Sequence, residues 1–259
     1  RTMHPPIAKT NSPLISVITV CKNSEVRIEK TIKSVIQQTY PDIEYIIIDG
    51  NSSDTTVATI KKFASIHKNK IRWISENDSG MYAAMNKGIK MARGTWTHIL
   101  NAGDTYHSEN SLKNAINFSS EGIDILLNSI NHLNRTGNLS IWTPVVHEEI
   151  NHYDFPHPGI LIKKAFYLKH GVYNEKYKII SDNIYITKYF PNSRYLITNH
   201  ILVDVKNDGI SVNPSIRRTV ETVIFTLCYQ KLSFPLKMTL VSKLFLHDVK
   251  VILENSLKP

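Results

Sequence analysis

The chain has 259 residues, of which 42% are hydrophobic and 20% charged, and its formal net charge is +9 at pH 7. This length allows one large α/β domain with a buried core, or one such domain and an appendage. Lys and Arg form no run longer than two residues, and no apolar run reaches about 18 residues, so we expect neither a nucleic-acid-binding module nor a transmembrane helix.

Strands and helices are predicted to alternate over the first part of the chain. The run from Leu14 to Cys21 is apolar and β-branched almost throughout, which is typical of a strand buried on both faces of a parallel sheet. The elements that follow are a helix over 28–36, a strand over 44–49, a helix over 57–63, a strand over 71–74, a helix over 81–92 and a strand over 95–100. This alternation predicts a parallel βαβ sheet with right-handed crossovers.

Beyond residue 120 the pattern is less regular. Strands are predicted over 123–127 and 195–205, helices over 163–170 and 181–190, and loops with short strands up to Pro158. From about Pro214 the pattern is helical. We therefore place a soft boundary near residue 212.

Polar side chains follow four consecutive predicted strands, at Asn23, at 49–54, at 76–80 and at 101–104. Because ligands of open parallel sheets bind outside the carboxyl ends of the strands, we expect a site at this edge. Lys22-Asn23-Ser24-Glu25 stands where a dinucleotide-binding loop needs glycines, and the chain has no Walker A sequence. A nucleotide diphosphate bound here would need a divalent cation, held by a strand-end carboxylate.

Four segments occur in order: residues 14–20 with Asn23, 48–55 (IDGNSSDT), 80–88 (GMYAAMNKG) and 100–104 (LNAGD). Together they resemble the donor-binding half of glycosyltransferase family 2, whose members have a GT-A fold. The resemblance is strong over residues 13–110. It extends more thinly to about residue 211 through Pro156-His157-Pro158, 177–182 (YKIISD) and 208–211 (DGIS).

The resemblance implies an α/β GT-A glycosyltransferase domain over 1–212, with a donor half at about 13–110 and an acceptor half at about 111–212. It implies that the nucleotide sugar is bound by Thr19, Val20, Asn23, Asp49, Ser52, Asp78, Gly80, Asn86, Lys87, Asn101, Ala102, Gly103 and Asp104. Asp104 would also ligate Mn²⁺ or Mg²⁺ on the donor diphosphate. A turn or helix N-cap would equally explain an aspartate at this position.

The resemblance further implies that Asp182 is the catalytic base, which removes the proton from the acceptor hydroxyl. The alternative is a plain helix N-cap. His157 would contact the acceptor or the donor phosphate, or simply pack. The chain departs from the family pattern in three places. Ala83 replaces a frequent Asp, Gly50 replaces a frequent acidic residue, and Asn101-Ala102-Gly103 stands in place of the first aspartate of the DXD-type motif. These changes leave room for a weakened enzyme.

Residues 213–259 are predicted to be a helical, basic and amphipathic extension, which either packs on the domain or faces anionic lipid. Cys21 and Cys228 lack the spacing of a metal site or a disulfide framework, so we expect buried free thiols and a reducing compartment. We therefore expect a cytoplasmic protein, in the lipid case peripheral at the inner face of the cytoplasmic membrane.

The resulting hypothesis is an inverting, metal-dependent glycosyltransferase. It would move a hexosyl or N-acetylhexosaminyl group from a nucleotide sugar, specifically a UDP-sugar, to a saccharide or lipid-linked acceptor in bacterial surface polysaccharide or lipopolysaccharide synthesis. The alternatives are a degenerate nucleotide-sugar-binding or scaffold protein and a nucleotidyltransferase, although the chain lacks the glycine-rich, basic loop that the latter needs after its first strand. The sequence leaves the sugar, the acceptor and the oligomeric state open.

Overall fold

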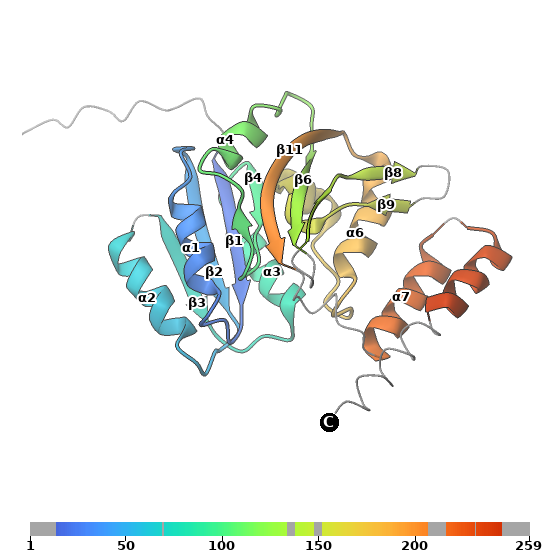
Figure 1. The fold of residues 1–259 in the computed structure, drawn as a ribbon, viewed down its shortest axis with the longest axis horizontal. Coiled ribbons are helices and arrows are strands. Elements are labelled where there is room, and N and C mark those ends of the chain that lie inside the picture. The colour runs from blue at the N-terminus through green and yellow to red at the C-terminus, as the bar shows by residue number, and fades with distance from the viewer. Residues whose placement is uncertain are drawn as a thin grey trace, which may run out of the picture.

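A computed structural model describes residues 14–68, 70–133, 138–147, 152–206, 216–230 and 232–244. Within these residues, nine strands form one mixed sheet in the order β3-β2-β1-β4-β10-β6-β11-β5, with β7 paired to β6 (Figure 1). Helices cover both faces of this sheet. A separate ribbon joins β8 (Val145–His147) to β9 (His152–Asp154).

The first half of the sheet is parallel, as predicted. β1 (Ile15–Cys21) pairs in parallel with β2 (Ile43–Asp49) and with β4 (Trp96–Ile99), and β2 pairs in parallel with β3 (Ile71–Ser75). Since the carboxyl ends of these strands lie at one edge, the loops that follow them converge there.

Alternate residues of β1 enter the two cores of the domain. Ile15 and Val17 pack beneath α1 (Ile28–Ile36), α2 (Thr56–Ile66) and α4 (Ser111–Ile116). Ile18 and Val20 pack on the opposite face beneath α3 (Met81–Met91), α5 (Lys164–His170) and α6 (Ser181–Tyr189). Burying an isoleucine or valine fully contributes about 1.5–3 kcal/mol, so the contacts of β1 on both faces stabilise the centre of the domain.

Gly88 brings α3 close to the sheet. A Cβ at this position would lie 2.3 Å from Cγ2 of Ile18, so only glycine allows α3 to approach β1 this closely. The start of α3 is thereby held against the strand ends.

The second half of the sheet mixes strand directions. β10 (Ile160–Lys163) runs antiparallel to β4 and to β6 (Ile125–Leu133), and β11 (Tyr195–Lys206) runs parallel to β6. The edge strand β5 (Thr105–Tyr106) and β7 (Leu139–Trp142) run antiparallel to β11 and β6. Two short 3₁₀ helices lie at His157–Gly159 and Phe190–Asn192.

The predicted α/β architecture and the order of its first elements are confirmed. The sequence analysis missed β5, α4 and β10, because segments of 2, 6 and 4 residues are too short to show a periodic pattern. The expected boundary near residue 212 lies outside the described residues.

The C-terminal part of the chain is helical where it is described. α7 (Ile216–Cys228) lies near the start of α6, and a further helix covers residues 234–244 (Figure 1). None of the helices that the structure describes is long and apolar enough to cross a membrane. Both cysteines are free; Cys21 is buried as expected, but Cys228 is exposed at the end of α7, so the expectation is wrong for this thiol.

Candidate active site

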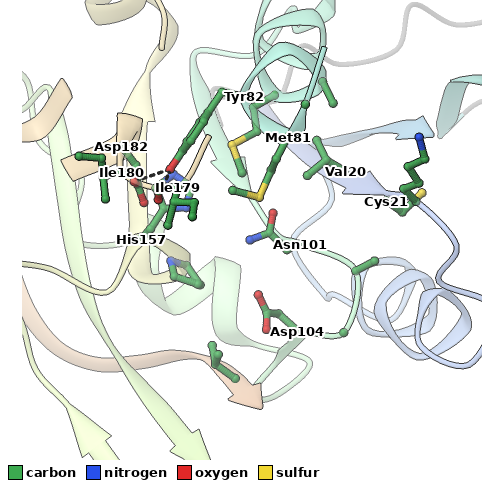
Figure 2. A pocket seen from close by; sticks show the side chains of 18 of the residues that line it. Val20, Cys21, Met81, Tyr82, Asn101, Asp104, His157, Ile179, Ile180 and Asp182 are labelled. Atoms are coloured by element: carbon green, nitrogen blue, oxygen red, sulfur yellow. Dashed lines mark hydrogen bonds between the residues drawn. The ribbon is translucent and has the colours of Figure 1, made fainter. Parts of the chain in front are cut away.

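One large cleft runs along the carboxyl edge of β1 and β4 and continues beneath α6 and α7. Figure 2 shows Val20, Asn101 and Asp104 on one side of this cleft and Asp182 and Tyr82 across it, with His157 between the two groups. The residues expected to bind the donor that line this cleft are Val20, Asn23, Asp78, Gly80, Asn101, Ala102, Gly103 and Asp104. Asp182 and His157 line it as well.

Asp49, Ser52 and Asn23 form a hydrogen-bonded cluster in the loops that follow β1 and β2, beside the cleft. The buried Asp49 carboxylate accepts bonds from the Ser52 amide (2.9 Å) and from the hydroxyls of Ser52 and Ser75. The Ser52 hydroxyl in turn accepts a bond from the Asn23 amide (2.8 Å), and Asn23 Oδ1 accepts one from the Ser53 amide (2.9 Å). Asp49 and Ser52 therefore lie behind the cleft wall and fix the loop that carries Asn23.

Thr19, Asn86 and Lys87 also lie outside the cleft lining that the structure describes. Thr19 is fully buried, and its hydroxyl lies 2.9 Å from that of Tyr45. The Lys87 ammonium pairs with Glu76 at 2.7 Å, beside the loop that leads to Asp78. These contacts place Thr19 in the core and Lys87 at the rim.

Asn86 joins α3 to the segment between α5 and α6. Its buried side chain donates to the Tyr173 carbonyl (2.9 Å) and to Glu175 (2.9 Å) and accepts from the Tyr173 amide (3.0 Å). This pair of bonds to one residue's backbone fixes the start of the segment that leads to Asp182.

The loop before α3 carries Asp78 and Gly80. Asp78 accepts a hydrogen bond from the Gly80 amide at 2.9 Å, and Gly80 has a φ of 130°, a conformation that favours glycine. A Cβ at Gly50 would lie 2.9 Å from Oδ2 of Asp78. An acidic side chain at position 50 would therefore meet the Asp78 carboxylate and repel it, unless the Asp78 side chain moved aside.

The segment from Asn101 to Asp104 leaves β4 as a tight turn. Gly103 has a φ of 114°, and its amide donates to the hydroxyl of Thr31 (3.0 Å) on α1. The Thr31 hydroxyl donates to the carbonyl of Asp104 (2.8 Å), whose amide donates to the Asn101 carbonyl (3.1 Å). α1 thus fixes the backbone on both sides of Asp104, while the carboxylate lies at the cleft.

Asn101 presents an oxygen that lacks a protein partner. Its Oδ1 is buried and has no hydrogen-bond partner among the residues that the structure describes. An unsatisfied buried acceptor costs about 1–3 kcal/mol, so its place in the cleft wall points to a bound group that satisfies it.

Asp182 lies in the first turn of α6 and is half-buried. The residue at the N-cap is Ile180, and Oδ1 of Asp182 instead accepts a hydrogen bond from the Tyr82 hydroxyl at 2.6 Å. Tyr82 is 1% exposed, and burial, together with the Asp182 charge, raises its pKa well above the ordinary value. The hydroxyl therefore stays protonated at neutral pH and donates.

His157 lies in the wall between the two carboxylates. Its Nε2 is 3.1 Å from the Tyr173 hydroxyl, and burial lowers its pKa although the nearby Asp182 charge opposes that shift. The imidazole is therefore neutral at pH 7, so it offers a hydrogen bond rather than a positive charge.

Comparison with known proteins identifies the family. The model described as glycosyl transferase family 2 matches residues 16–180, more than half of the 259 residues. The chain belongs to glycosyl transferase family 2. The family expected from the sequence motifs is therefore confirmed.

Two relatives show the sequence identity between this chain and other glycosyltransferases. A PGL/p-HBAD biosynthesis glycosyltransferase of Mycobacterium bovis is 25% identical over 208 residues, which cover 76% of this chain and 78% of that protein. An uncharacterized glycosyltransferase of Mycobacterium tuberculosis is 36% identical over 108 residues, or 41% of this chain and 40% of that protein.

Two solved structures share the fold. A mannosyltransferase of Pyrobaculum calidifontis in complex with GDP-Man and Mn²⁺ matches with a TM-score of 0.65 at 16% identity, over 84% of this chain and 64% of that one. TarS of S. aureus in complex with UDP-GlcNAc matches with a TM-score of 0.64 at 19% identity, over 90% of this chain and 71% of that one. The expected GT-A fold is thereby confirmed.

The residues of this glycosyltransferase fit a cation that is shared with a diphosphate. The described residues contain no group of three or more His, Cys, Asp or Glu side chains that could hold a metal ion alone. Mg²⁺ and Mn²⁺ prefer oxygen ligands, and Mg²⁺ is commonly held by one or two carboxylates together with substrate phosphates. Asp104 lines the cleft, and the unsatisfied Asn101 oxygen belongs to the same turn, so this segment is compatible with such a site.

Sequence reasoning missed two residues that shape this site. Tyr82 lies within GMYAAMNKG, on the inner face of α3. A buried tyrosine needs a hydrogen-bond partner, so this position could have indicated a polar contact such as the one with Asp182. Glu221 of α7 is 7% exposed, and it binds two backbone amides before Asp182. No local pattern reveals this contact, because it joins segments 42 or more residues apart.

Proposed function

We propose that this family member transfers a sugar from a UDP-sugar to a hydroxyl of a saccharide or lipid-linked saccharide, with inversion at the anomeric carbon. The observation that carries the proposal is that Asp104 and Asp182 line the two sides of one cleft (Figure 2). One carboxylate is suited to bind the donor diphosphate through a cation, and the other is suited to accept a proton.

The donor half would hold the nucleotide. In this proposal, the loops of Val20 and Asn23 and of Asp78 and Gly80 enclose the nucleoside, and the turn at Asn101–Asp104 faces the diphosphate. Asp49, Ser52, Thr19, Asn86 and Lys87 would act from behind these loops through the hydrogen bonds and the ion pair described above. Asp104 would hold Mn²⁺ or Mg²⁺, which supplies positive charge for the departing diphosphate.

The acceptor half would supply the base. As the acceptor oxygen bonds to the anomeric carbon, the bond from that carbon to the diphosphate oxygen breaks, and the diphosphate departs with the bonding electrons. The acceptor proton passes to Asp182. Because Tyr82 fixes Oδ1 of Asp182, the proton would be accepted at Oδ2. The neutral His157 would donate or accept a hydrogen bond to the acceptor or to a donor phosphate.

The names of the relatives support a proposal for the donor and the product class. TarS was solved with UDP-GlcNAc, and the Mycobacterium bovis relative is a biosynthesis glycosyltransferase for PGL/p-HBAD. We therefore propose a hexosyl or N-acetylhexosaminyl group and a role in bacterial surface polysaccharide or lipopolysaccharide synthesis. The mannosyltransferase was solved with GDP-Man, so GDP-sugars are the alternative donors to test.

The test is a panel of UDP- and GDP-sugars with Mn²⁺, measured by release of the nucleoside diphosphate with and without saccharide acceptors. We expect turnover of a UDP-sugar that disappears in Asp104→Ala. Turnover of GDP-sugars alone would contradict the donor assignment. If no nucleoside diphosphate is released from any of the sugars, or if its release survives Asp104→Ala, the proposed activity is wrong.

We also propose that the C-terminal helices contact anionic lipid at the inner face of the cytoplasmic membrane. The helix over 234–244 exposes large apolar side chains, among them Phe234 at 72%, Leu236, Met238 and Leu240. Lys237 and Lys243 lie on the same short helix, and apolar contact combined with positive charge suits an anionic lipid surface.

Liposome sedimentation tests this contact. Wild-type protein should sediment with vesicles that contain phosphatidylglycerol, and the double variant Phe234→Asp/Leu240→Asp should sediment less. Leu168→Asp is the matched control, since Leu168 is 77% exposed on α5, outside this helix. Equal sedimentation of wild type and the double variant would overturn the membrane contact.

A further inference from the structure

α7 packs on the segment that leads to Asp182. Ile179, Ile180 and Ile184 form a small core, against which Phe225 of α7 and Tyr229 pack. Figure 1 shows α7 near the start of α6, the helix that carries Asp182. The extension is therefore joined to the acceptor half through the residues that surround the base.

The carboxylate of Glu221 binds the backbone of this segment directly. Oε1 accepts a hydrogen bond from the Lys178 amide at 2.9 Å, and Oε2 accepts one from the Ile179 amide at 2.9 Å. Glu221 is 7% exposed, and burying an ionised carboxylate is costly unless it is hydrogen-bonded. Hydrogen bonds to a charged acceptor are about twice as strong as neutral ones, so this contact is a strong restraint on the segment.

The same two residues are held from the donor side. The Ile179 carbonyl lies 2.8 Å from the Tyr82 hydroxyl, and the Lys178 ammonium donates to the Ser79 carbonyl at 2.5 Å. Glu221 therefore binds the backbone amides of Lys178 and Ile179. The Lys178 side chain contacts the loop before α3, and the Ile179 carbonyl contacts α3 itself. Asp182 follows only three residues after Ile179.

α7 also forms part of the cleft wall. Arg218, Thr222, Phe225 and Thr226 line the same cleft as Asp182. The helix that contacts the segment before Asp182 therefore also contributes side chains to the cleft.

We propose that Glu221 is a positioning residue for the acceptor base: it fixes residues 178–179 so that Asp182 faces the acceptor, and α7 forms the acceptor-side wall. This proposal rests on the proposed function, because it assigns to α7 a role in the transfer step. Donor binding, which takes place at the loops after β1 and β4, should not depend on Glu221.

The experiment compares Glu221→Ala and Glu221→Gln with wild type in the full-length protein. Gln keeps one acceptor oxygen, so the expected order of transfer rate is wild type, then Gln, then Ala, with Ala slower by about tenfold to a hundredfold in kcat. The dissociation constant of UDP with Mn²⁺ should stay within about twofold of wild type in both variants. Val220→Ala is the matched control, since the neighbouring Val220 is 51% exposed on the same helix.

Hydrogen exchange provides a readout that needs no activity. The amides of 178–182 should exchange faster in Glu221→Ala than in wild type or Val220→Ala, while the amides of β1 and β2 keep their protection. Unchanged exchange at 178–182 would overturn the proposal. Faster exchange with an unchanged kcat would also overturn it, since the contact would then be structural only. If wild type transfers no sugar at all, the proposed function fails, and the exchange measurement still decides whether Glu221 restrains this segment.

Discussion

The Tyr82 hydroxyl lies 2.6 Å from Oδ1 of Asp182, and these two residues come from opposite halves of the chain. Tyr82 lies in the first turn of α3, which belongs to the half that resembles a donor-binding unit, and Asp182 lies in the first turn of α6. This hydrogen bond thus joins α3 to the proposed base.

Removing this bond should slow transfer without weakening donor binding. In Tyr82→Phe the ring still packs, but Asp182 loses its donor, and hydrogen bonds to charged groups are worth about 1.5–3 kcal/mol. We expect kcat to fall by about tenfold or more and the UDP dissociation constant to stay unchanged. Tyr185→Phe is the control, since its hydroxyl donates to the Gly171 carbonyl instead. An equal loss in both variants would show a general packing effect.

An acidic residue at position 50 should weaken nucleotide binding. Gly50→Asp places a carboxylate against Asp78, because a Cβ at Gly50 already lies 2.9 Å from Oδ2 of Asp78. We expect weaker UDP binding by calorimetry, with partial recovery in Gly50→Asp/Asp78→Asn, where the like charges are gone. Gly50→Asn controls for size. If Gly50→Asn weakens binding as much as Gly50→Asp, repulsion is not the cause.

Gly103→Ala should destabilise the turn that carries Asp104. Residue 103 has a φ of 114°, which strains any side chain with a Cβ by about 1–3 kcal/mol. We expect a lower free energy of unfolding in urea and weaker Mn²⁺-dependent UDP binding, because Asp104 is the next residue. Gly171→Ala is the control, since Gly171 also has a positive φ, 86°, but ends α5. Loss of metal-dependent binding in both variants would contradict a local effect.

The free energy of unfolding should fall as the pH drops from about 6.5 towards 4. This range lies between the ordinary histidine pKa and the pKa of His98. Burial lowers the pKa of His98 to about 4, and burial also lowers those of His157, His170 and His200. Below the ordinary histidine pKa the unfolded chain binds protons that the folded chain does not, so each lowered pKa costs folding stability on acidification.

For His98 alone the loss approaches about 3 kcal/mol as the pH falls to about 4, where the folded chain also begins to protonate this ring. Urea unfolding at pH 7.5 and at pH 4.5 measures the loss, and NMR titration of the His98 ring follows the group directly. Equal stability at both pH values, or a His98 ring that titrates near 6.5, would contradict the account.

The sequence was sufficient to predict the parallel half of the fold and the polar residues at its strand ends. Continuous apolar runs such as Ile15–Cys21 have a local signature, and the loops after them converge at one edge by topology alone. Asn23, Asp78 and Asp104 lie at the cleft for this reason.

The contacts between the halves could not be predicted in the same way. The partner of Asp182 is 100 residues away, and the bond from Glu221 to Ile179 spans 42 residues. The resemblance also does not distinguish a residue that faces the cleft from one that supports its wall. Asp49 and Asn86 are buried behind it, and their hydrogen bonds become visible only in three dimensions.

The central claim is that Asp104 binds the donor and Asp182 acts in transfer. Its most direct test measures donor binding and sugar transfer separately in a variant of each carboxylate. Asp104→Asn should lose Mn²⁺-dependent UDP binding and transfer together, whereas Asp182→Asn should bind UDP with Mn²⁺ as tightly as wild type and transfer sugar at least about a hundredfold more slowly. Calorimetry and a nucleoside diphosphate release assay on the same preparations measure both quantities. Undiminished transfer by Asp182→Asn, or undiminished Mn²⁺-dependent binding by Asp104→Asn, would contradict the assigned roles.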